Sequence, residues 1–252
     1  MSDAQNEKTP GLSPDEEQEV SHNQPPRAAV LHEIIRAQGD HELERTLAAL
    51  WWSALAAGLT MGLSLMAMGL FYARLPEGDS AQVIASLGYS AGFLAVILAR
   101  QQLFTENTLT AVLPLMTTPT LTNLGRLLRL WTIVLLGNLA GTLLVAWVML
   151  ELPIFDSKTD VAFLDVGRKV MENGIGQMFA KGIVSGWMIA TMVWMIPSME
   201  HAKIWIILMI TYLMALGDFT HIVVGSVEVS YLVWAGEQSC RASRPNVSQP
   251  ST

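Results

Sequence analysis

Long stretches without Asp, Glu, Lys or Arg alternate with short charged segments along this chain. A helix needs about 20 mostly apolar residues to cross the hydrocarbon core of a bilayer. The uncharged stretches that approach or exceed this length are 46–73, 80–99, 130–150 and 182–199. These four stretches predict membrane-spanning helices.

Two further apolar stretches are interrupted. The first, 107–125, contains Pro114 and Pro119, and the second, 204–217, is short and ends at Asp218. We therefore predict two broken spans, 80–118 interrupted around 101–107 and 203–235 interrupted around 217–225. A break inside a membrane is tolerated where it lines a cavity, and breaks at matching positions of two halves indicate a transport site. The alternative is that each polar gap is only a loop between short helices.

The elements thus follow the order long, broken, long, and then long, broken. This order predicts an all-α integral membrane protein in which the second half repeats the first. The transmembrane domain is expected at 46–236, with spans at about 46–73, 80–118, 126–150, 180–198 and 203–235.

Residues 27–45 carry apolar side chains on one helical face and predict an amphipathic interfacial helix. Residues 155–181 predict an extramembrane connector. The polar tail 237–252 cannot span, so we expect the sixth helix of a complete repeat to be absent.

Composition and charge narrow the class of protein. The chain of 252 residues is 51% hydrophobic and 15% charged, whereas soluble domains average about 25% charged residues. A nucleic-acid-binding protein is therefore not expected. The single cysteine, Cys240, and the lack of Cys/His pairs at zinc spacing indicate neither a disulfide scaffold nor a structural zinc site, and no cofactor is expected. Residues 1–26 are acidic and polar and predict a disordered tail. Basic residues before the first span favour a cytoplasmic N-terminus.

Several ionisable residues fall in or beside the two breaks. A charged side chain costs roughly 2.5–3.5 kcal/mol at the centre of a membrane helix, so these groups must pair, reach an interface or face water. We expect Arg100 to pair with Glu106, either as part of a pore or as a purely structural bridge. His221 is the most informative residue, because an intramembrane imidazole titrates near neutral pH and is a functional candidate. The alternative is a buried histidine that serves only the core.

Four G-x-x-x-G patterns lie in four different apolar stretches: Gly58/Gly62, Gly88/Gly92, Gly137/Gly141 and Gly182/Gly186. Small residues at this spacing let helix backbones approach closely in a membrane. The four patterns therefore predict a tightly packed bundle.

Three motifs together resemble the formate/nitrite transporter family of bacterial inner-membrane proteins. They are Leu103-Phe104-Thr105 with Glu106-Asn107 in the first break, Gly137-Asn138-Leu139-Ala140-Gly141 in the third span, and the second break with its histidine. The segments 99–107 and 217–228 are similar to the divergent YfdC-like branch of that family.

This resemblance implies an aquaporin-like protomer of six spans in two inverted repeats, assembled as a homo-pentamer in the inner membrane. It implies passage of small monovalent anions such as formate or nitrite, with proton transfer from the central histidine as an option. By position, Phe104 and Thr105 would form the first constriction, with Thr105 in reach of His221. The candidate pore residues are therefore Arg100, Leu103, Phe104, Thr105, Glu106, Asn107, Asp218, His221 and Glu228.

Two departures from the family pattern affect these expectations. Arg100 and Glu106 stand where typical members have small residues, and Arg100 would attract anions whereas Glu106 and Glu228 would repel them. A chain without a sixth helix would lack one wall of the pore, so we expect impaired transport.

Two other classes of function remain as alternatives. One is a membrane enzyme with His221 and either Asp218 or Glu228 as acid and base, but the chain has no G-x-S-x-G, H-E-x-x-H or phosphate-binding glycine loop, and we expect no enzyme. The other is a non-conducting membrane protein whose acidic tail binds a partner.

Overall fold

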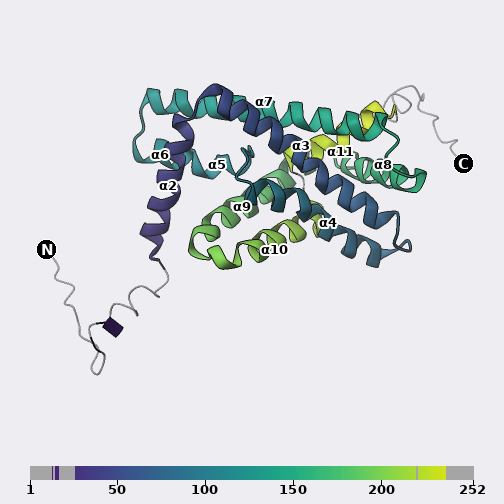
Figure 1. Cartoon of the computed structure of the whole chain (residues 1–252), viewed down its shortest axis with the longest axis horizontal. Coiled ribbons are helices and arrows are strands. Elements are labelled where there is room, and N and C mark those ends of the chain that lie inside the picture. The colour runs from purple at the N-terminus through teal and green to yellow at the C-terminus, as the bar shows by residue number, and fades with distance from the viewer. Residues whose placement is uncertain (1–12, 14, 17–25, 220, 237–252) are drawn as a thin grey trace, which may run out of the picture.

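The computed structural model describes residues 13, 15–16, 26–219 and 221–236. The predictions of a disordered tail at 1–26, a polar tail at 237–252 and an absent sixth helix fall almost entirely outside these residues. The helices of the bundle (Figure 1) are α2 (Ala28–Glu44), α3 (Leu47–Tyr72), α4 (Asp79–Leu98), α5 (Asn107–Thr110), α6 (Val112–Thr117), α7 (Leu121–Glu151), α8 (Ser157–Met171), α9 (Ile175–Met195), η1 (Ile196–Ser198), η2 (Glu200–Ala202), α10 (Lys203–Leu216) and α11 (Ile222–Trp234).

Four described helices are long and apolar enough to cross a membrane: α3, α4, α7 and the continuous segment Ile175–Ser198. One of them, α4, continues through a break into α5 and α6, and a second broken span consists of α10 and α11. No strand occurs among the described residues. The predicted all-α membrane fold with two broken helices is therefore confirmed.

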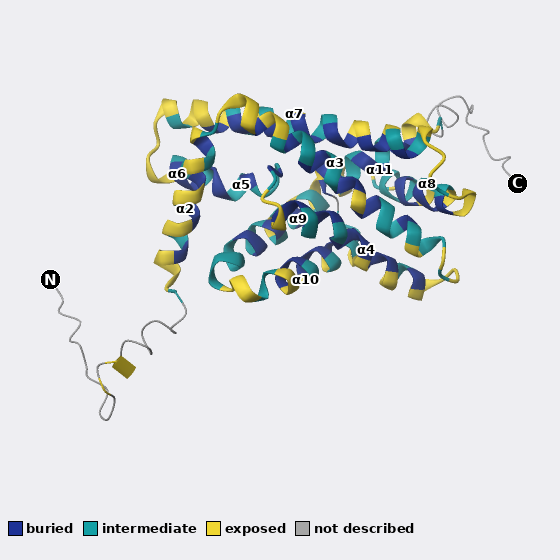
Figure 2. Cartoon of the chain, in the orientation of Figure 1, coloured by how far each residue is buried: buried dark blue, intermediate teal, exposed yellow. Residues whose placement is uncertain are grey.

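Helix α3 forms the centre of the bundle because glycines let its neighbours approach. It packs mainly on α7 and α4, and Figure 2 shows its buried side in dark blue. A Cβ added at Gly58 would lie 2.2 Å from the Asn138 carbonyl oxygen, and one at Gly141 would lie 2.4 Å from that of Leu55. At Gly88, the added Cβ would lie 2.7 Å from the Ala67 carbonyl carbon. Three of the four glycine patterns thus mark close helix crossings.

The fourth pattern behaves differently. A Cβ added at Gly186 meets no atom within 4 Å, and the nearby side chains of Phe179 and Trp187 are 73% and 68% exposed. Helix α9 therefore presents its glycines and aromatic rings outward, because no described helix lies against that face.

Two helices outside the long spans are docked on the broken ones. Helix α2 packs on α5, α6 and α7, and its Gly39 is so close to α5 that an added Cβ would lie 2.0 Å from the Thr110 carbonyl oxygen. Helix α8 packs on α11 and α3, and Asp156 is its N-cap. The backbone N–H and the hydroxyl of Thr159 donate to the Asp156 carboxylate, which lowers the pKa of that carboxyl.

We predict opposite effects for the same substitution at two glycines. Gly141→Ala forces a methyl group against backbone atoms of α3 and should lower the free energy of unfolding by about 1–3 kcal/mol or more. Gly186→Ala has open space and a better helix former, and should raise it by up to about 1 kcal/mol. Thermal unfolding of the two purified variants tests this, and equal losses of stability would contradict it.

Candidate functional site

Both broken spans end their first helix in the same way. In each, the residue after the helix cap takes a left-handed backbone, Arg100 with φ 52° and Asp218 with φ 58°. Both ends are closed by the paired backbone bonds of a Schellman motif. At the end of α4, Gln101 N–H donates to Val96 O at 3.0 Å and Arg100 N–H to Ile97 O at 3.2 Å. At the end of α10, Phe219 N–H donates to Met214 O at 2.9 Å and Asp218 N–H to Ala215 O at 3.2 Å. These bonds satisfy the final carbonyls of α4 and α10 inside the bundle.

The second break is shorter than predicted. We expected an interruption over 217–225, but α11 begins at Ile222 and contains Gly225. The reason is local, because His221 is the N-cap of α11 and its side chain accepts from the Val224 N–H. The helix can therefore restart directly after the histidine.

The two breaks touch through one side-chain contact. Thr105 Oγ1 lies 2.7 Å from His221 Nε2, although the two residues are 116 positions apart. His221 is 4% exposed, so this contact lies inside the bundle. The resemblance had placed these two residues within reach of each other, and they are in contact.

The hydrogen bonds around His221 indicate one tautomer. Nδ1 accepts from the Val224 N–H at 3.4 Å, so the proton of a neutral ring is assigned to Nε2. Nε2–H then donates to Thr105 Oγ1. That hydroxyl has no other partner among the described residues, and its own proton is free to donate to a molecule in the pore.

Apolar side chains surround this contact. The ring of Phe93 meets the imidazole edge-on, with centroids 4.9 Å apart, and Leu103 is buried in the same core. Phe104 contacts Trp131 with ring centroids 6.3 Å apart. The Thr105–His221 pair is thus a polar contact surrounded by apolar side chains.

Asn138 of α7 holds the first break in place. It is fully buried, and its amide nitrogen donates to the carbonyl oxygens of Ala54 and Gln102, each at 2.8 Å. Its Oδ1 accepts from the Phe104 N–H at 2.9 Å. One side chain therefore satisfies two backbone groups of the break and ties them to the Ala54 carbonyl of α3.

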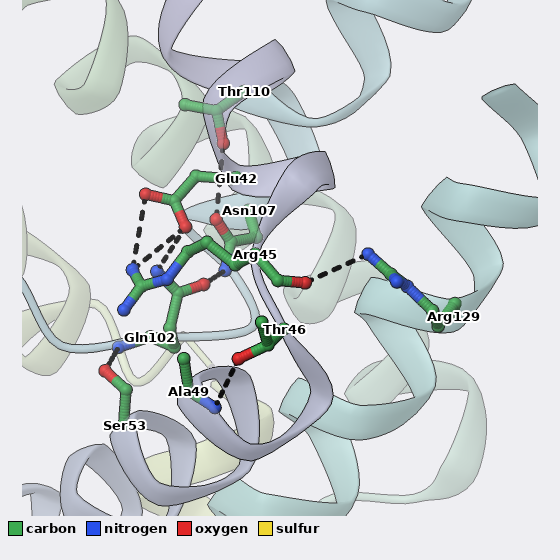
Figure 3. Close-up of polar contacts among 9 residues, drawn as sticks. All are labelled: Glu42, Arg45, Thr46, Ala49, Ser53, Gln102, Asn107, Thr110 and Arg129. Atoms are coloured by element: carbon green, nitrogen blue, oxygen red, sulfur yellow. Dashed lines mark hydrogen bonds and ion pairs between the residues drawn. The ribbon is translucent and has the colours of Figure 1, made fainter.

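A second network connects the first break to α2 (Figure 3). Gln102 donates through Nε2 to Glu42 at 2.7 Å and accepts through Oε1 from Asn107 at 2.8 Å. Arg45 forms an ion pair with Glu42 at 3.1 Å, and the Gln102 N–H donates to Ser53 Oγ at 3.1 Å. The Asn107 amide is thus engaged with Gln102 and supports the loop.

On the face of the bundle opposite α2, a cavity of about 840 Å³ leads to His221. Its walls come from the end of α3, the start of α4, α8 and α11, and include Asp218 and Glu228. Asp218 forms an ion pair with Lys169 of α8 at 3.0 Å. The structure thus brings three of the predicted residues, Asp218, His221 and Glu228, to one cavity, which we call the vestibule.

The expected pair of Arg100 and Glu106 is wrong. No ion pair joins them among the described residues, because the left-handed backbone at Arg100 turns the chain outward, where the side chain is exposed. Glu106 instead lies at the start of α5, where the charges of Lys203 and Glu42 act on it. The two residues therefore occupy different surroundings.

Sequence reasoning passed over several residues that shape the site. Asn138 entered only as part of a family motif, although a buried Asn between two close-packing glycines is itself a signal of a backbone contact. Gln102 and Phe93 carried no such signal, because a glutamine in a polar gap and a phenylalanine in an apolar span are common. No described group of three or more His, Cys, Asp or Glu side chains is placed to hold a metal ion.

Comparisons with known proteins identify relatives over most of the chain. The model of the formate/nitrite transporter family matches residues 29–248. The chain is 55% identical over 212 residues to the inner membrane protein YfdC of Escherichia coli (strain K12). The alignment covers 84% of this chain and 68% of the relative.

Two solved structures share the fold. A pentameric formate channel with formate bound aligns over 76% of both chains, with a TM-score of 0.66 and 19% identity. An FNT family ion channel aligns over 81% of this chain and 80% of its own, with a TM-score of 0.63 and 20% identity. At these identities the likeness concerns the backbone alone, and it confirms the predicted fold class.

We predict that Asn138 is required for stability. Asn138→Ala would remove the partner of the Gln102 carbonyl and of the Phe104 N–H in the break, at a cost of about 1–3 kcal/mol each. Thr142→Val is the matched control, because the Thr142 hydroxyl donates only within α7. Thermal unfolding should show a large loss for Asn138→Ala and less than about 1 kcal/mol for Thr142→Val; similar values for both would contradict the role of Asn138.

We also predict that Arg100→Gly is more stable than Arg100→Ala. A left-handed backbone costs a residue with a Cβ roughly 1 kcal/mol, whereas glycine adopts it freely. The difference between the two variants should be about 1 kcal/mol in favour of Gly, although glycine is the poorer helix former. Unfolding in detergent measures it, and a more stable alanine variant would show that the left-handed turn is not maintained.

Proposed function

This chain belongs to the formate/nitrite transporter family, and we propose that it transports small monovalent anions of the formate or nitrite type through a pore centred on Thr105 and His221. The family consists of membrane transporters, in agreement with the expectation that the chain is not an enzyme. The observation that carries the proposal is the contact of 2.7 Å between Thr105 Oγ1 and His221 Nε2.

The contact gives an anion a hydrogen-bond donor among buried apolar side chains. With Nε2–H donating to Thr105 Oγ1, the threonine hydroxyl proton points elsewhere and is available to an anion oxygen. A donor chain of this kind replaces part of the hydration shell that a small anion loses in an apolar constriction.

Proton transfer would lower the barrier further. A bare anion in a low-dielectric constriction is costly to hold, and the neutral acid is much cheaper to move. His221 is placed to relay that proton through Thr105: Nε2–H passes to the Thr105 hydroxyl, the hydroxyl proton passes to the anion, and Nδ1 takes up a proton from water in exchange for its bond with the Val224 N–H. We therefore propose proton-coupled passage, with formate flux that increases as the pH falls.

The outer surface supports a protein that sits in a membrane as an oligomer. Large apolar side chains are exposed on the long helices, including Trp52 of α3, Ile183 of α9 and Trp187 of α9, at 66%, 60% and 68%. We propose that these helices face lipid and neighbouring copies in a homo-pentamer of the inner membrane. The formate channel that shares the fold is pentameric. We propose a cytoplasmic N-terminus, because Arg27, Arg36 and Arg45 before α3 favour that orientation.

We predict that two substitutions at the constriction abolish coupled transport. His221→Asn removes the titrating group and Thr105→Val removes the hydroxyl, so each should lower formate flux into proteoliposomes by tenfold or more, a change of about 1.4 kcal/mol in the barrier. Residual flux in His221→Asn should no longer rise with falling pH.

The matched control is Thr117→Val, since the Thr117 hydroxyl donates within its own helix at the end of α6. This variant should keep the flux of the unsubstituted protein. Normal, pH-dependent flux in His221→Asn would refute the role assigned to the histidine.

A further inference from the structure

Asp218 occupies a position that disfavours an acidic side chain in two ways. Its backbone is left-handed, with φ 58°, although the residue before it, Gly217, would adopt that conformation freely. It also follows directly after the C-terminal cap of α10, where the helix dipole carries partial negative charge and repels a carboxylate. Glycine or asparagine is the usual residue at such a helix end. An aspartate here therefore indicates a role beyond ending the helix.

The equivalent residue of the first break, Arg100, carries the opposite charge. It has the same left-handed backbone, with φ 52°, directly after the cap of α4. Its positive charge agrees with the dipole at that helix end, and its exposed side chain forms no ion pair with a residue that the structure describes. The two breaks thus share one backbone motif, and only the second places an acid there. The backbone motif alone does not explain Asp218.

The Asp218 carboxylate is the partner of a lysine in the vestibule. Lys169 Nζ of α8 lies 3.0 Å from Asp218 Oδ1, and the two side chains are 39% and 42% exposed. Both residues line the vestibule together with His221. An anion that enters from this side therefore meets a lysine that already holds a carboxylate.

Helix packing fixes the lysine beside the second break. A Cβ added at Gly167 of α8 would lie 2.8 Å from the Glu228 carbonyl oxygen, so the backbones of α8 and α11 are in close contact there. Lys169 is two residues further along α8, in its last turn. This crossing keeps the ammonium group within reach of Asp218.

A carboxylate in the protein and a formate ion present the same chemical group to Lys169. The lysine ammonium binds either one as a compact positive charge with three donors. Asp218 is attached to the same chain, so its effective concentration at the lysine exceeds that of an anion in dilute solution. A small anion must displace the Asp218 carboxylate before it can bind Lys169.

We propose that Asp218 is a specificity-determining residue that lowers the affinity of the vestibule for anions, because it acts as the counter-ion of Lys169. This inference rests on the proposed transport function, which it extends by naming the residue that limits anion binding on this side of the pore. Without the Asp218 charge, Lys169 binds a small monovalent anion directly. The attraction is strongest at low ionic strength, where exposed charges are screened least.

Binding of formate to the purified full chain tests the role of Asp218. We would measure formate affinity by calorimetry at about pH 8, where a carboxylic acid is ionised. Asp218→Asn removes the charge and keeps a residue that tolerates a left-handed backbone, and it should bind formate about fivefold more tightly. Asp218→Gly should give the same gain and guards against a folding defect of one variant. Both gains should shrink when the salt concentration rises.

Two controls separate the release of Lys169 from a general change in charge. Asp79→Asn removes a negative charge from the same cavity, but Asp79 lies exposed in the first turn of α4 and pairs with no described base. It should change the affinity by less than about twofold. In a Lys169→Met background, Asp218→Asn has no ammonium to release and should also gain less than about twofold. A fivefold gain in either control would overturn the proposal.

Flux into proteoliposomes separates this proposal from the transport function. Tighter, Lys169-dependent binding in both Asp218 variants without formate flux in any protein would reject the proposed function and support the role of Asp218. Formate flux together with unchanged binding in both Asp218 variants would overturn the role of Asp218 and leave the proposed function standing.

Discussion

A helix that breaks inside a membrane leaves backbone groups that lipid cannot satisfy, and the structure of this protein depends on how those groups find partners. The Schellman bonds close the ends of α4 and α10. The Asn138 amide nitrogen donates to carbonyl oxygens of the first break and of α3, and its oxygen accepts from an N–H of the break. His221 caps α11. Because protein groups satisfy both breaks, the loops can hold Thr105 and His221 together inside the bundle.

Close packing between helices makes this arrangement possible. The glycines of α3, α4 and α7 bring three helix backbones together, which places Asn138 against the first break. Helix α2 then fixes the other side of the same loop through Glu42 and Gln102. The constriction is thus held from two directions, whereas α9 leaves its outer face uncovered among the described helices.

The charges that line the vestibule differ from those of a typical anion pathway. An anion pathway is commonly lined by Arg or Lys, but here the acids predominate and Lys169 is paired with Asp218. Arg100, the base that we expected to serve the pore, is exposed beyond the end of α4. Little net positive charge therefore remains on the vestibule walls to attract an anion.

The sequence by itself determined the spans, the two breaks and the candidates Thr105 and His221, because runs of apolar residues and their interruptions are local properties of the chain. It misjudged the length of the second break, where a histidine cap acts, and it wrongly paired Arg100 with Glu106, where one backbone dihedral turns the side chain away. The resemblance read from the sequence placed Thr105 within reach of His221, and the tertiary structure shows the contact. Only the tertiary structure decided that Asn138 holds the loop and that Tyr89 and Glu228 share one cavity. These contacts join residues far apart in the chain, and helix crossings that no local pattern encodes bring them together.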